Sequence, residues 1–287
     1  MSLKASELIL NPDGSVYHLH LKSEDIAETI ITVGDPDRVS EVSKFFDKID
    51  LKIQKREFHT QTGWFKNKRI TVISTGIGTD NIDIVLNELD ALVNIDLKKR
   101  TVKKSLTRLQ IIRIGTSGAL QENIPLDSFL VSEKAIGFDS LLHYYKGFEN
   151  DLEFCSAVHN HLKLENLAKP YIISSDKKLT DLFLEDPTFI KGITATNVGF
   201  YAPQGRALRA KLYDQNFIKK LQSFFYKNQK ITNLEMETSG IYGLSKLLGH
   251  QAISLNAIMA NRATGEFSKK PQKTMDKLIL STLNKLI

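Results

Sequence analysis

The chain has 287 residues, of which 41% are hydrophobic and 25% are charged, the balance of an ordinary soluble globular protein with a core of useful size. No apolar run approaches the length of a membrane span, and the N-terminal stretch has no signal-peptide core, so we expect a cytoplasmic protein without membrane contact. The single cysteine, Cys155, excludes an internal disulfide framework and fits a reducing compartment.

The formal net charge of +6 indicates either nucleic-acid contact or a site that holds small anions. Much of the excess lies in one short stretch, which contains Lys98, Lys99, Arg100, Lys103, Lys104 and Arg108. Because no aromatic residues are interleaved with these cations, a solvated loop or helix face explains the stretch best. RNA or DNA contact stays open as the alternative.

Two segments near the N-terminus carry candidate residues. Residues 16–21 alternate in character and predict a short strand, on which His18 and His20 point the same way; two exposed histidines on an edge strand are the simplest interpretation. The β-branched run 30–33 then leads into Gly34, and the sequence predicts a strand, a glycine turn and a helix with Pro36 in its first turn. Glycine amides and a helix N-terminus attract anions, and Arg38 adds donors, although simple turn chemistry explains the same pattern.

The next segments predict a hairpin and a second glycine turn. Residues 55–65 and 69–74 form the hairpin-like pair, and the turn 75–81 opens a helix whose apolar face contains Ile82, Val85, Leu86 and Leu89. The turn resembles half of a dinucleotide fingerprint, but Asn81 stands where the third glycine is required. The dinucleotide-binding interpretation therefore fails.

A buried arginine marks the following strand. Residues 110–114 have the pattern of a buried strand. Burial of the Arg113 charge in such a strand costs free energy unless an anion pairs with it. The stretch 115–118, with two glycines and two hydroxyls, predicts an amide-rich turn suited to an oxyanion. It contains neither a P-loop nor a nucleophile elbow.

Residues 200–206 follow a further predicted strand, 193–196, and combine aromatic and planar polar side chains. Phe200 offers a stacking face beside the amide of Gln204 and the guanidinium of Arg206. This set suits a flat heterocycle with carbonyls and an imide N–H. A surface loop with incidental polar residues remains the alternative.

Two carboxylates, Glu235 and Glu237, flank Met236 just before a helix with Ile241, Leu244, Leu247 and Leu248 on its apolar side. First-turn acids of a surface helix are the simplest explanation. The alternation with Met236 instead indicates a strand end entering a buried corner, where a carboxylate needs donors such as a sugar diol.

The C-terminal part predicts a long apolar strand over 252–260, a mobile loop over 264–271 and a final helix. Strands alternating with helices, with glycine turns at strand ends, predict an α/β fold with a mixed, mainly parallel sheet and ligands at its carboxyl edge. Because no repeat or linker is present, we expect one domain over 1–287, an α/β/α sandwich.

Together, four motifs resemble the nucleoside phosphorylase family, which includes uridine phosphorylases and hexameric purine nucleoside phosphorylases. They are Gly34-Asp35-Pro36-Asp37-Arg38, Arg56-Glu57-Phe58, Arg113-Ile114-Gly115-Thr116-Ser117-Gly118 and Glu235-Met236-Glu237. The stretch from Phe200 to Arg206 is similar to the pyrimidine branch of that family.

The resemblance implies roles for individual residues. Phosphate would be bound by Gly34, Arg38, Arg56, Arg113, Gly115 and Thr116, the ribose by His18, Glu235, Met236 and Glu237, and the base by Phe200, Gln204 and Arg206. Among these, Arg206, Glu237 and Arg113 would act on the reacting atoms. Arg56 and His18 would come from a neighbouring subunit, so the resemblance implies at least a dimer and allows a hexamer.

The implied activity is reversible phosphorolysis of uridine, with inorganic phosphate as co-substrate and no cofactor. Asn81 stands where some relatives have a serine near a potassium site, so no metal is expected. The basic stretch 97–109 is similar to an insertion without a family role. No Asp occupies 259–262, which favours pyrimidines; a purine-specific enzyme, a basic nucleic-acid-binding module and an inactive phosphorylase-like protein are the alternatives.

Overall fold

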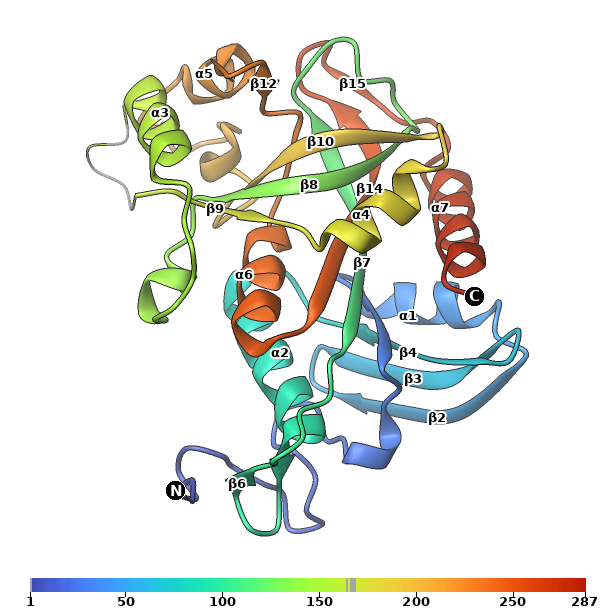
Figure 1. Cartoon of the computed structure of the whole chain (residues 1–287). Coiled ribbons are helices and arrows are strands. Elements are labelled where there is room, and N and C mark those ends of the chain that lie inside the picture. Colours follow the sequence, from blue (N-terminus) through green and yellow to red (C-terminus); the bar gives the residue numbers. More distant parts are fainter. Residues whose placement is uncertain (1, 164, 166–168) are drawn as a thin grey trace.

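The computed structural model describes residues 2–163, 165 and 169–287, so residues 1, 164 and 166–168 of the expected domain lie outside the description. Helices cover both faces of one 11-stranded mixed sheet (Figure 1), which confirms the predicted α/β class. The elements are η1 (Ser23–Asp25), β1 (Thr29–Val33), α1 (Pro36–Ser43), β2 (Lys48–Lys55), β3 (Phe58–Phe65), β4 (Lys68–Ser74), α2 (Thr79–Asn94), β5 (Ile95–Asp96), β6 (Thr101–Val102), β7 (Gln110–Ala119), β8 (Phe129–Gly137), η2 (Leu141–Tyr144), α3 (Leu152–Leu162), β9 (Tyr171–Ser174), α4 (Lys177–Leu184), β10 (Phe189–Thr196), η3 (Ala202–Gln204), α5 (Phe217–Ser223), β11 (Phe225–Tyr226), β12 (Gln229–Lys230), β13 (Asn233–Glu235), α6 (Thr238–Leu248), β14 (Gln251–Asn261), β15 (Glu266–Phe267) and α7 (Pro271–Lys285).

The strand order is β15-β14-β8-β10-β13-β7-β1-β4-β3-β2, with β9 beside β8. Strands β4, β1, β7 and β14 run parallel to one another, and β8, β10 and β13 form a second parallel set of opposite direction. Since β7 pairs with both β14 and β13, the strands β7, β14, β8, β10 and β13 close into a ring. The long strand β7 therefore links this ring to the open part of the sheet (Figure 1).

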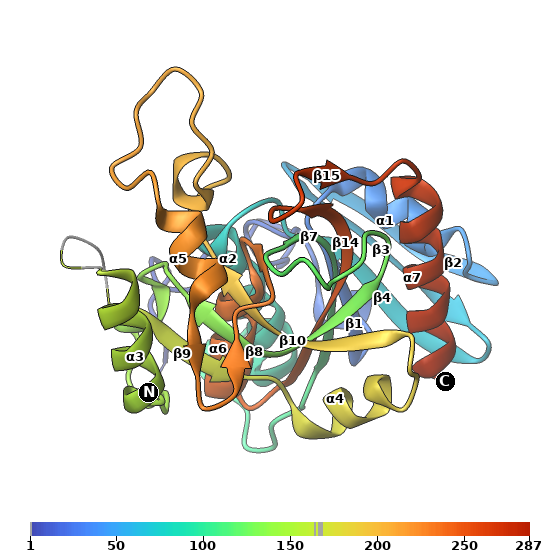
Figure 2. The ribbon, with the colours of Figure 1, turned by 90° about the horizontal axis from the view of Figure 1, so that it is seen from above.

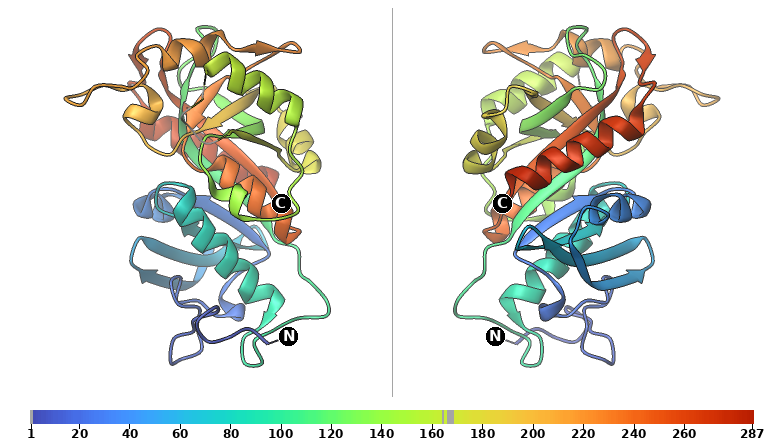
Figure 3. Two further views of the ribbon diagram at one scale, coloured as in Figure 1. Left: turned by 90° about the vertical axis from the view of Figure 1, so that its left-hand side faces the viewer. Right: turned by 90° about the vertical axis from the view of Figure 1, so that its right-hand side faces the viewer.

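The central strands are apolar on both sides because both faces are covered. In β1, Ile30 packs in the layer of α2 and α6, whereas its neighbour Ile31 packs in the layer of α1, α4 and α7. The two layers are seen from opposite sides in Figure 3, where α2 is teal and α7 is red. Helices α3 and α5 form a third layer outside the ring, with Phe154 and Phe224 at a ring-centroid distance of 5.5 Å.

The predicted strand at 16–21 is wrong. This segment forms a tight turn in which Val16 N donates to Leu21 O and His20 adopts φ +56°. The amides of His18 and Leu19 instead donate to the carboxylate of Glu88 on α2, at 2.9–3.1 Å. A side chain on α2 thus takes the place of a neighbouring strand.

The predicted oxyanion turn at 115–118 is also wrong, because β7 runs straight through it to Ala119 and pairs with β14. The loop expected over 264–271 contains the short strand β15, which pairs with the end of β14. The hairpin predicted from 55–74 is confirmed: β3 and β4 are antiparallel, joined by Lys66 and Asn67, both with positive φ.

The basic stretch 97–109 forms most of a small hairpin with β5 and β6 at the lower end of Figure 1. Its side chains hold local backbone: Arg100 donates to Leu8 O, and Lys103 Nζ donates to Val93 O at 2.8 Å. Within the part of the chain that the structure describes, no helix combines the length and apolar composition needed to cross a membrane.

Candidate active site

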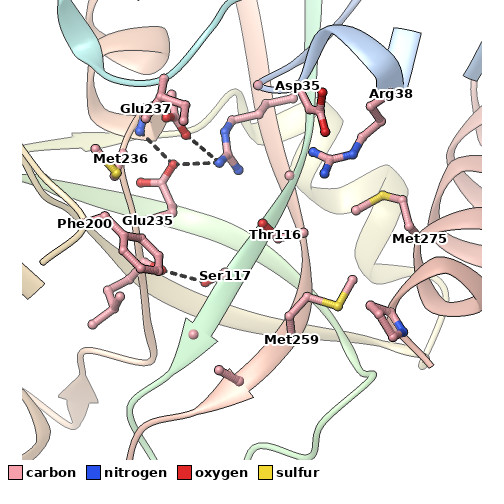
Figure 4. Close-up of a pocket in the computed structure, with 18 of the residues that line it drawn as sticks. Asp35, Arg38, Thr116, Ser117, Phe200, Glu235, Met236, Glu237, Met259 and Met275 are labelled. Atoms are coloured by element: carbon pink, nitrogen blue, oxygen red, sulfur yellow. Dashed lines mark hydrogen bonds and ion pairs between the residues drawn. The ribbon is translucent and has the colours of Figure 1, made fainter. Parts of the chain in front are cut away.

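One cavity of about 960 Å³ brings together segments from the whole chain. Its walls come from the start of α1, the turn before α2, β7, the loop around η3, the β13–α6 corner and the β14–α7 region. Of the predicted site residues, those that line it are Gly34, Arg38, Arg113, Gly115, Thr116, Phe200, Gln204, Arg206, Glu235, Met236 and Glu237. Figure 4 shows Glu235 and Glu237 on one side, Arg38 on the other and Thr116 between them.

Arg113 is buried and joins the two predicted acids. Its Nη2 lies 2.7 Å from Glu237 Oε2 and 3.1 Å from Glu235 Oε2, and its Nη1 donates to Asn256 Oδ1 at 2.9 Å. Burial alone would lower the pKa of the Arg113 guanidinium, but the charges of Glu235 and Glu237 raise it above its ordinary value. The anion that the sequence required for Arg113 is therefore supplied largely by the chain itself.

The side chain of Arg113 folds back over Gly115 on the same face of β7. A Cβ atom at Gly115 would lie 2.2 Å from Arg113 Nη1 and 2.4 Å from its Cζ. Glycine is needed here because the guanidinium occupies the space of a side chain.

Glu235 ends β13 and serves as the anchor of the corner. Its Oε2 accepts hydrogen bonds from the amides of Glu237 and Thr238, both at 2.9 Å, and its Oε1 accepts from Thr196 Oγ1 at 2.6 Å. These amides begin α6, where a carboxylate is favoured by the free N–H groups and the helix dipole. Because Oε2 already accepts two amides and faces the Arg113 guanidinium, only Oε1 of Glu235 can accept a further hydrogen bond.

Glu237 is the N-cap residue of α6 and has spare capacity. Its Oε1 accepts from Gly78 N at 3.0 Å and its Oε2 from Arg113, so each oxygen can accept a further hydrogen bond. Burial, followed by the charge of Glu235, raises the pKa of Glu237, although Arg113 opposes the shift. A buried acid of this kind fits vicinal hydroxyl donors.

Arg38 is the second arginine of the cavity and its charge is poorly balanced. It lies in the first turns of α1, which begins at the N-cap Asp35. In the described part of the chain, its ion pair is a 4.0 Å contact with Glu41, and its buried Nε makes no hydrogen bond. Burial lowers the pKa of Arg38, against the raising effect of Asp35 and Glu41. Such a cation favours an anionic ligand.

A third group of side chains lies on the loop around η3. The guanidinium carbon of Arg206 is 3.9 Å from the ring centroid of Phe200, and Arg206 Nη1 donates to Gln204 Oε1 at 2.5 Å. Burial and the nearby charge of Arg262 lower the pKa of Arg206 to about 10. Aromatic face, amide and guanidinium are thus in contact, as the sequence predicted, and Figure 2 shows the following loop, before α5, projecting from the body.

Two predicted residues, Arg56 and His18, are not among those that line the cavity. The guanidinium of Arg56 lies 5.6 Å from the ring centroid of Tyr17, and His18 Nδ1 lies 2.6 Å from Glu88 Oε1. Because the Tyr17 and His18 rings are 4.9 Å apart, these side chains form a separate cluster. A role for them in this site requires a second subunit, as the sequence analysis expected.

Three contributors were missed. The amide of Gly78 holds Glu237, Thr196 holds Glu235, and Arg262 Nη1 donates to Gln204 O at 3.1 Å. In the sequence, Gly78 belongs to the glycine turn 75–81, which fails as a dinucleotide fingerprint. In the structure it is the N-cap residue of α2 and has φ +99°, a conformation that favours glycine. Backbone donors and paired strand ends leave no residue-type signal in a sequence.

The chain matches the model of the phosphorylase superfamily over residues 28–284. It is 30% identical over 265 residues to a uridine phosphorylase of Thermococcus kodakarensis, covering 91% of this chain and 83% of that one. A purine nucleoside phosphorylase of the DeoD type from Buchnera aphidicola is 26% identical over 279 residues, covering 95% of this chain and all (100%) of that one. A Trypanosoma brucei nucleoside phosphorylase, whose crystal structure is described as showing uridine phosphorylase activity, superposes with a TM-score of 0.86 at 31% identity and covers 96% of this chain and 99% of its own. Matched over nearly its whole length, the chain belongs to the phosphorylase superfamily and is an enzyme of that family.

Proposed function

We propose that this enzyme is a uridine phosphorylase, a pentosyltransferase that converts uridine and inorganic phosphate into uracil and ribose 1-phosphate. One observation carries the proposal: a single cavity holds a poorly balanced cation, Arg38, an acid with free acceptor sites, Glu237, and a polar pair in which Arg206 lies over the Phe200 ring and donates to Gln204. These three groups match the phosphate, the sugar diol and the base.

The phosphate is bound on the Arg38 side. Arg38 provides the main charge, and Gly34 at the start of the turn leaves room for the anion beside the α1 N-terminus. Thr116, on β7 between Arg38 and the acids, supplies a hydroxyl. Arg113 and Gly115 act less directly, because the guanidinium is already paired with both carboxylates.

The ribose is held by Glu237, which accepts hydrogen bonds from the 2′ and 3′ hydroxyls, with Met236 packing against the sugar. Glu235 supports Glu237 by fixing the α6 amides. A carboxylate near the ring also favours the positive charge that develops on the sugar in the transition state.

The bond changes place opposite charges at the two ends of the cavity. A phosphate oxygen bonds to C1′ while the bond from C1′ to N1 of uracil breaks, and its electron pair passes to the uracil ring, which then takes a proton from solvent. Arg206 stabilises that anion, and Gln204 orients the ring against Phe200. The lowered pKa of Arg206 reflects a partly buried cation, for which an anionic neighbour is favourable.

Arg56 and His18 complete the site from a second copy of the chain, with Arg56 reaching phosphate and His18 reaching the 5′ hydroxyl. The protein is therefore at least a dimer, and a hexamer satisfies the same requirement. The buried free thiol of Cys155 fits a reducing, cytoplasmic compartment.

The test is to incubate the protein with uridine, 2′-deoxyuridine, inosine and adenosine, each with and without phosphate. We expect uracil from uridine only when phosphate is present. Release of base without phosphate would contradict phosphorolysis, and faster turnover of inosine or adenosine would favour the purine alternative, which the relationship to a purine nucleoside phosphorylase keeps open.

A further inference from the structure

A third buried carboxylate, Asp139, lies directly behind the β13–α6 corner that carries Glu235 and Glu237. It is 3% exposed and makes no ion pair within the described part of the chain. Its partners are neutral donors: Leu141 N at 2.9 Å, Tyr171 OH at 2.6 and 2.7 Å, and Ser239 Oγ at 2.8 Å. Burial of a carboxylate without a counter-ion costs free energy, which the four hydrogen bonds to Asp139 offset in part. A buried carboxylate with this full set of donors is therefore a candidate for a specific role.

The hydrogen bonds of Asp139 lead to the sugar-binding corner. Ser239 lies in the first turn of α6, two residues after Glu237, and its amide donates to Thr196 Oγ1 at 3.0 Å. The same Thr196 hydroxyl donates to Glu235 Oε1 at 2.6 Å. The first turn of α6 is thus tied to Asp139 through one side chain and to Glu235 through its backbone.

Tyr171 fastens this network to the sheet. It is fully buried on β9, and its hydroxyl contacts Asp139 and, at 3.1 Å, Ser239 Oγ. Burial and the charge of Asp139 raise the pKa of Tyr171 well above its ordinary value, so its hydroxyl stays a neutral donor. Its ring also packs edge-on against His143, with centroids 5.9 Å apart.

The orientation of Glu237 depends on this turn. As N-cap residue, Glu237 makes no side-chain cap bond of its own, so its carboxylate is placed by α6 together with Gly78 and Arg113. A hydrogen bond to a hydroxyl weakens steeply as its geometry departs from linear, and a shift of the turn changes that geometry.

We propose that Asp139, together with Tyr171 and Ser239, is a positioning group that aligns Glu237 with the ribose diol and so sets the preference for ribonucleosides over 2′-deoxyribonucleosides. The inference rests on the proposed function, since it concerns the same site. None of these three residues lines the cavity, so they act through Glu237 without touching the substrate.

The experiment compares kcat/KM for uridine and 2′-deoxyuridine in the wild type, Asp139→Asn and Tyr171→Phe. Asn keeps the size of Asp139, but its amide donates where the carboxylate accepted, which reorients Ser239. We expect the uridine to deoxyuridine ratio to fall about tenfold in Asp139→Asn, which corresponds to about 1.4 kcal/mol, and in the same direction but less in Tyr171→Phe. The KM for phosphate should stay within about twofold, because Arg38 is untouched.

The matched control is Asp176→Ala, which removes the N-cap of α4 (Asp176 Oδ1 accepts from Leu179 N at 3.1 Å) on a helix that does not line the cavity. It should lower Tm without changing the ratio. A ratio in Asp139→Asn equal to that of the wild type, with both substrates slowed alike, would overturn the inference and leave Asp139 with a purely structural role. A wild type that cleaves neither nucleoside would instead overturn the proposed function, and a Tyr171→Phe measurement keeps the test valid if Asp139→Asn does not fold.

Discussion

Arg38, which is half-buried, and Arg113, which is buried, line the same cavity, yet their electrostatic surroundings differ. Arg113 faces two carboxylates at 2.7 and 3.1 Å, whereas Arg38 makes one ion pair within the described part of the chain, a 4.0 Å contact with Glu41. The pKa of Arg113 is raised and that of Arg38 is lowered. A buried cation that is already balanced contributes to the architecture, whereas one that is not balanced is available to a ligand.

The largest effect should follow the loss of Arg113. Arg113→Met leaves Glu235 and Glu237 buried without their cation, and removing one partner of a buried pair costs about 3–5 kcal/mol in the free energy of unfolding. Urea denaturation of the wild type and variant measures this loss. A variant as stable as the wild type would contradict the view that Arg113 holds the β13–α6 corner together.

Arg38→Met should give the opposite pattern. Since Arg38 makes only the 4.0 Å contact with Glu41 among the residues that the structure describes, the free energy of unfolding should change little. In contrast, kcat/KM for phosphate should fall about 100- to 1,000-fold, as for the loss of one strong anion-binding donor. Steady-state kinetics at varied phosphate provide the measurement, with Lys44→Met, on the outer side of the same helix region, as the control. Equal phosphate kinetics in Arg38→Met and the wild type would refute the assignment of the anion site.

Arg206→Ala should act at the other end of the cavity. Loss of the cation that stabilises the departing uracil should lower kcat about 100-fold, equivalent to about 2.7 kcal/mol, with little change in the KM for phosphate. A nucleoside with a better leaving group, such as 5-fluorouridine, should recover part of the loss. If both nucleosides lose the same factor, Arg206 serves binding and not departure of the base.

The smallest effect concerns pH. Because burial raises the pKa of Glu237, the acid limb of kcat/KM for uridine should have its midpoint above the ordinary glutamate value of 4.5. Stability should change with pH in the opposite direction to activity. Because the folded-state pKa of Glu237 is raised, its contribution to the free energy of unfolding is full below pH 4.5 and is lost as pH rises through the folded-state pKa. Between pH 4.5 and the folded-state pKa, activity should therefore rise while the stability contribution of Glu237 falls. An acid midpoint of kcat/KM below pH 4.5 would contradict the raised pKa of Glu237.

The fold was largely predictable because periodicity and glycine turns are local signals. The strand before Gly34, the helix that starts at Pro36 and the corner at Glu235–Glu237 all lie where the sequence placed them. The strand predicted for residues 16–21 was wrong because this segment is held by Glu88, which is 70 positions from His18 in the sequence. The turn predicted for residues 115–118 was wrong because a glycine in this stretch can also continue a strand. Gly115 does so, since the folded-back side chain of Arg113 occupies the space where a side chain at 115 would lie.

Most residues of the candidate site were predictable from the sequence, but the hydrogen bonds and ion pairs among them were not. The resemblance of the motifs to the nucleoside phosphorylase family placed Arg38, Arg113, Glu235 and Glu237 in one site, and all four line the cavity. Two further residues that the resemblance implied, Arg56 and His18, do not line it. That Arg113 is paired internally, that Gly78 donates to Glu237 and that Asp139 lies behind the corner depend on contacts across more than 80 positions, which only the folded chain specifies.

Direct binding of inorganic phosphate, by calorimetric titration of the wild type and Arg38→Met without nucleoside, tests the central claim most simply. We predict that the wild type binds phosphate and that the folded variant binds it at least about 50-fold more weakly, a difference of about 2.3 kcal/mol. Phosphate binding of equal strength in both proteins would show that the anion is seated elsewhere and would contradict the account.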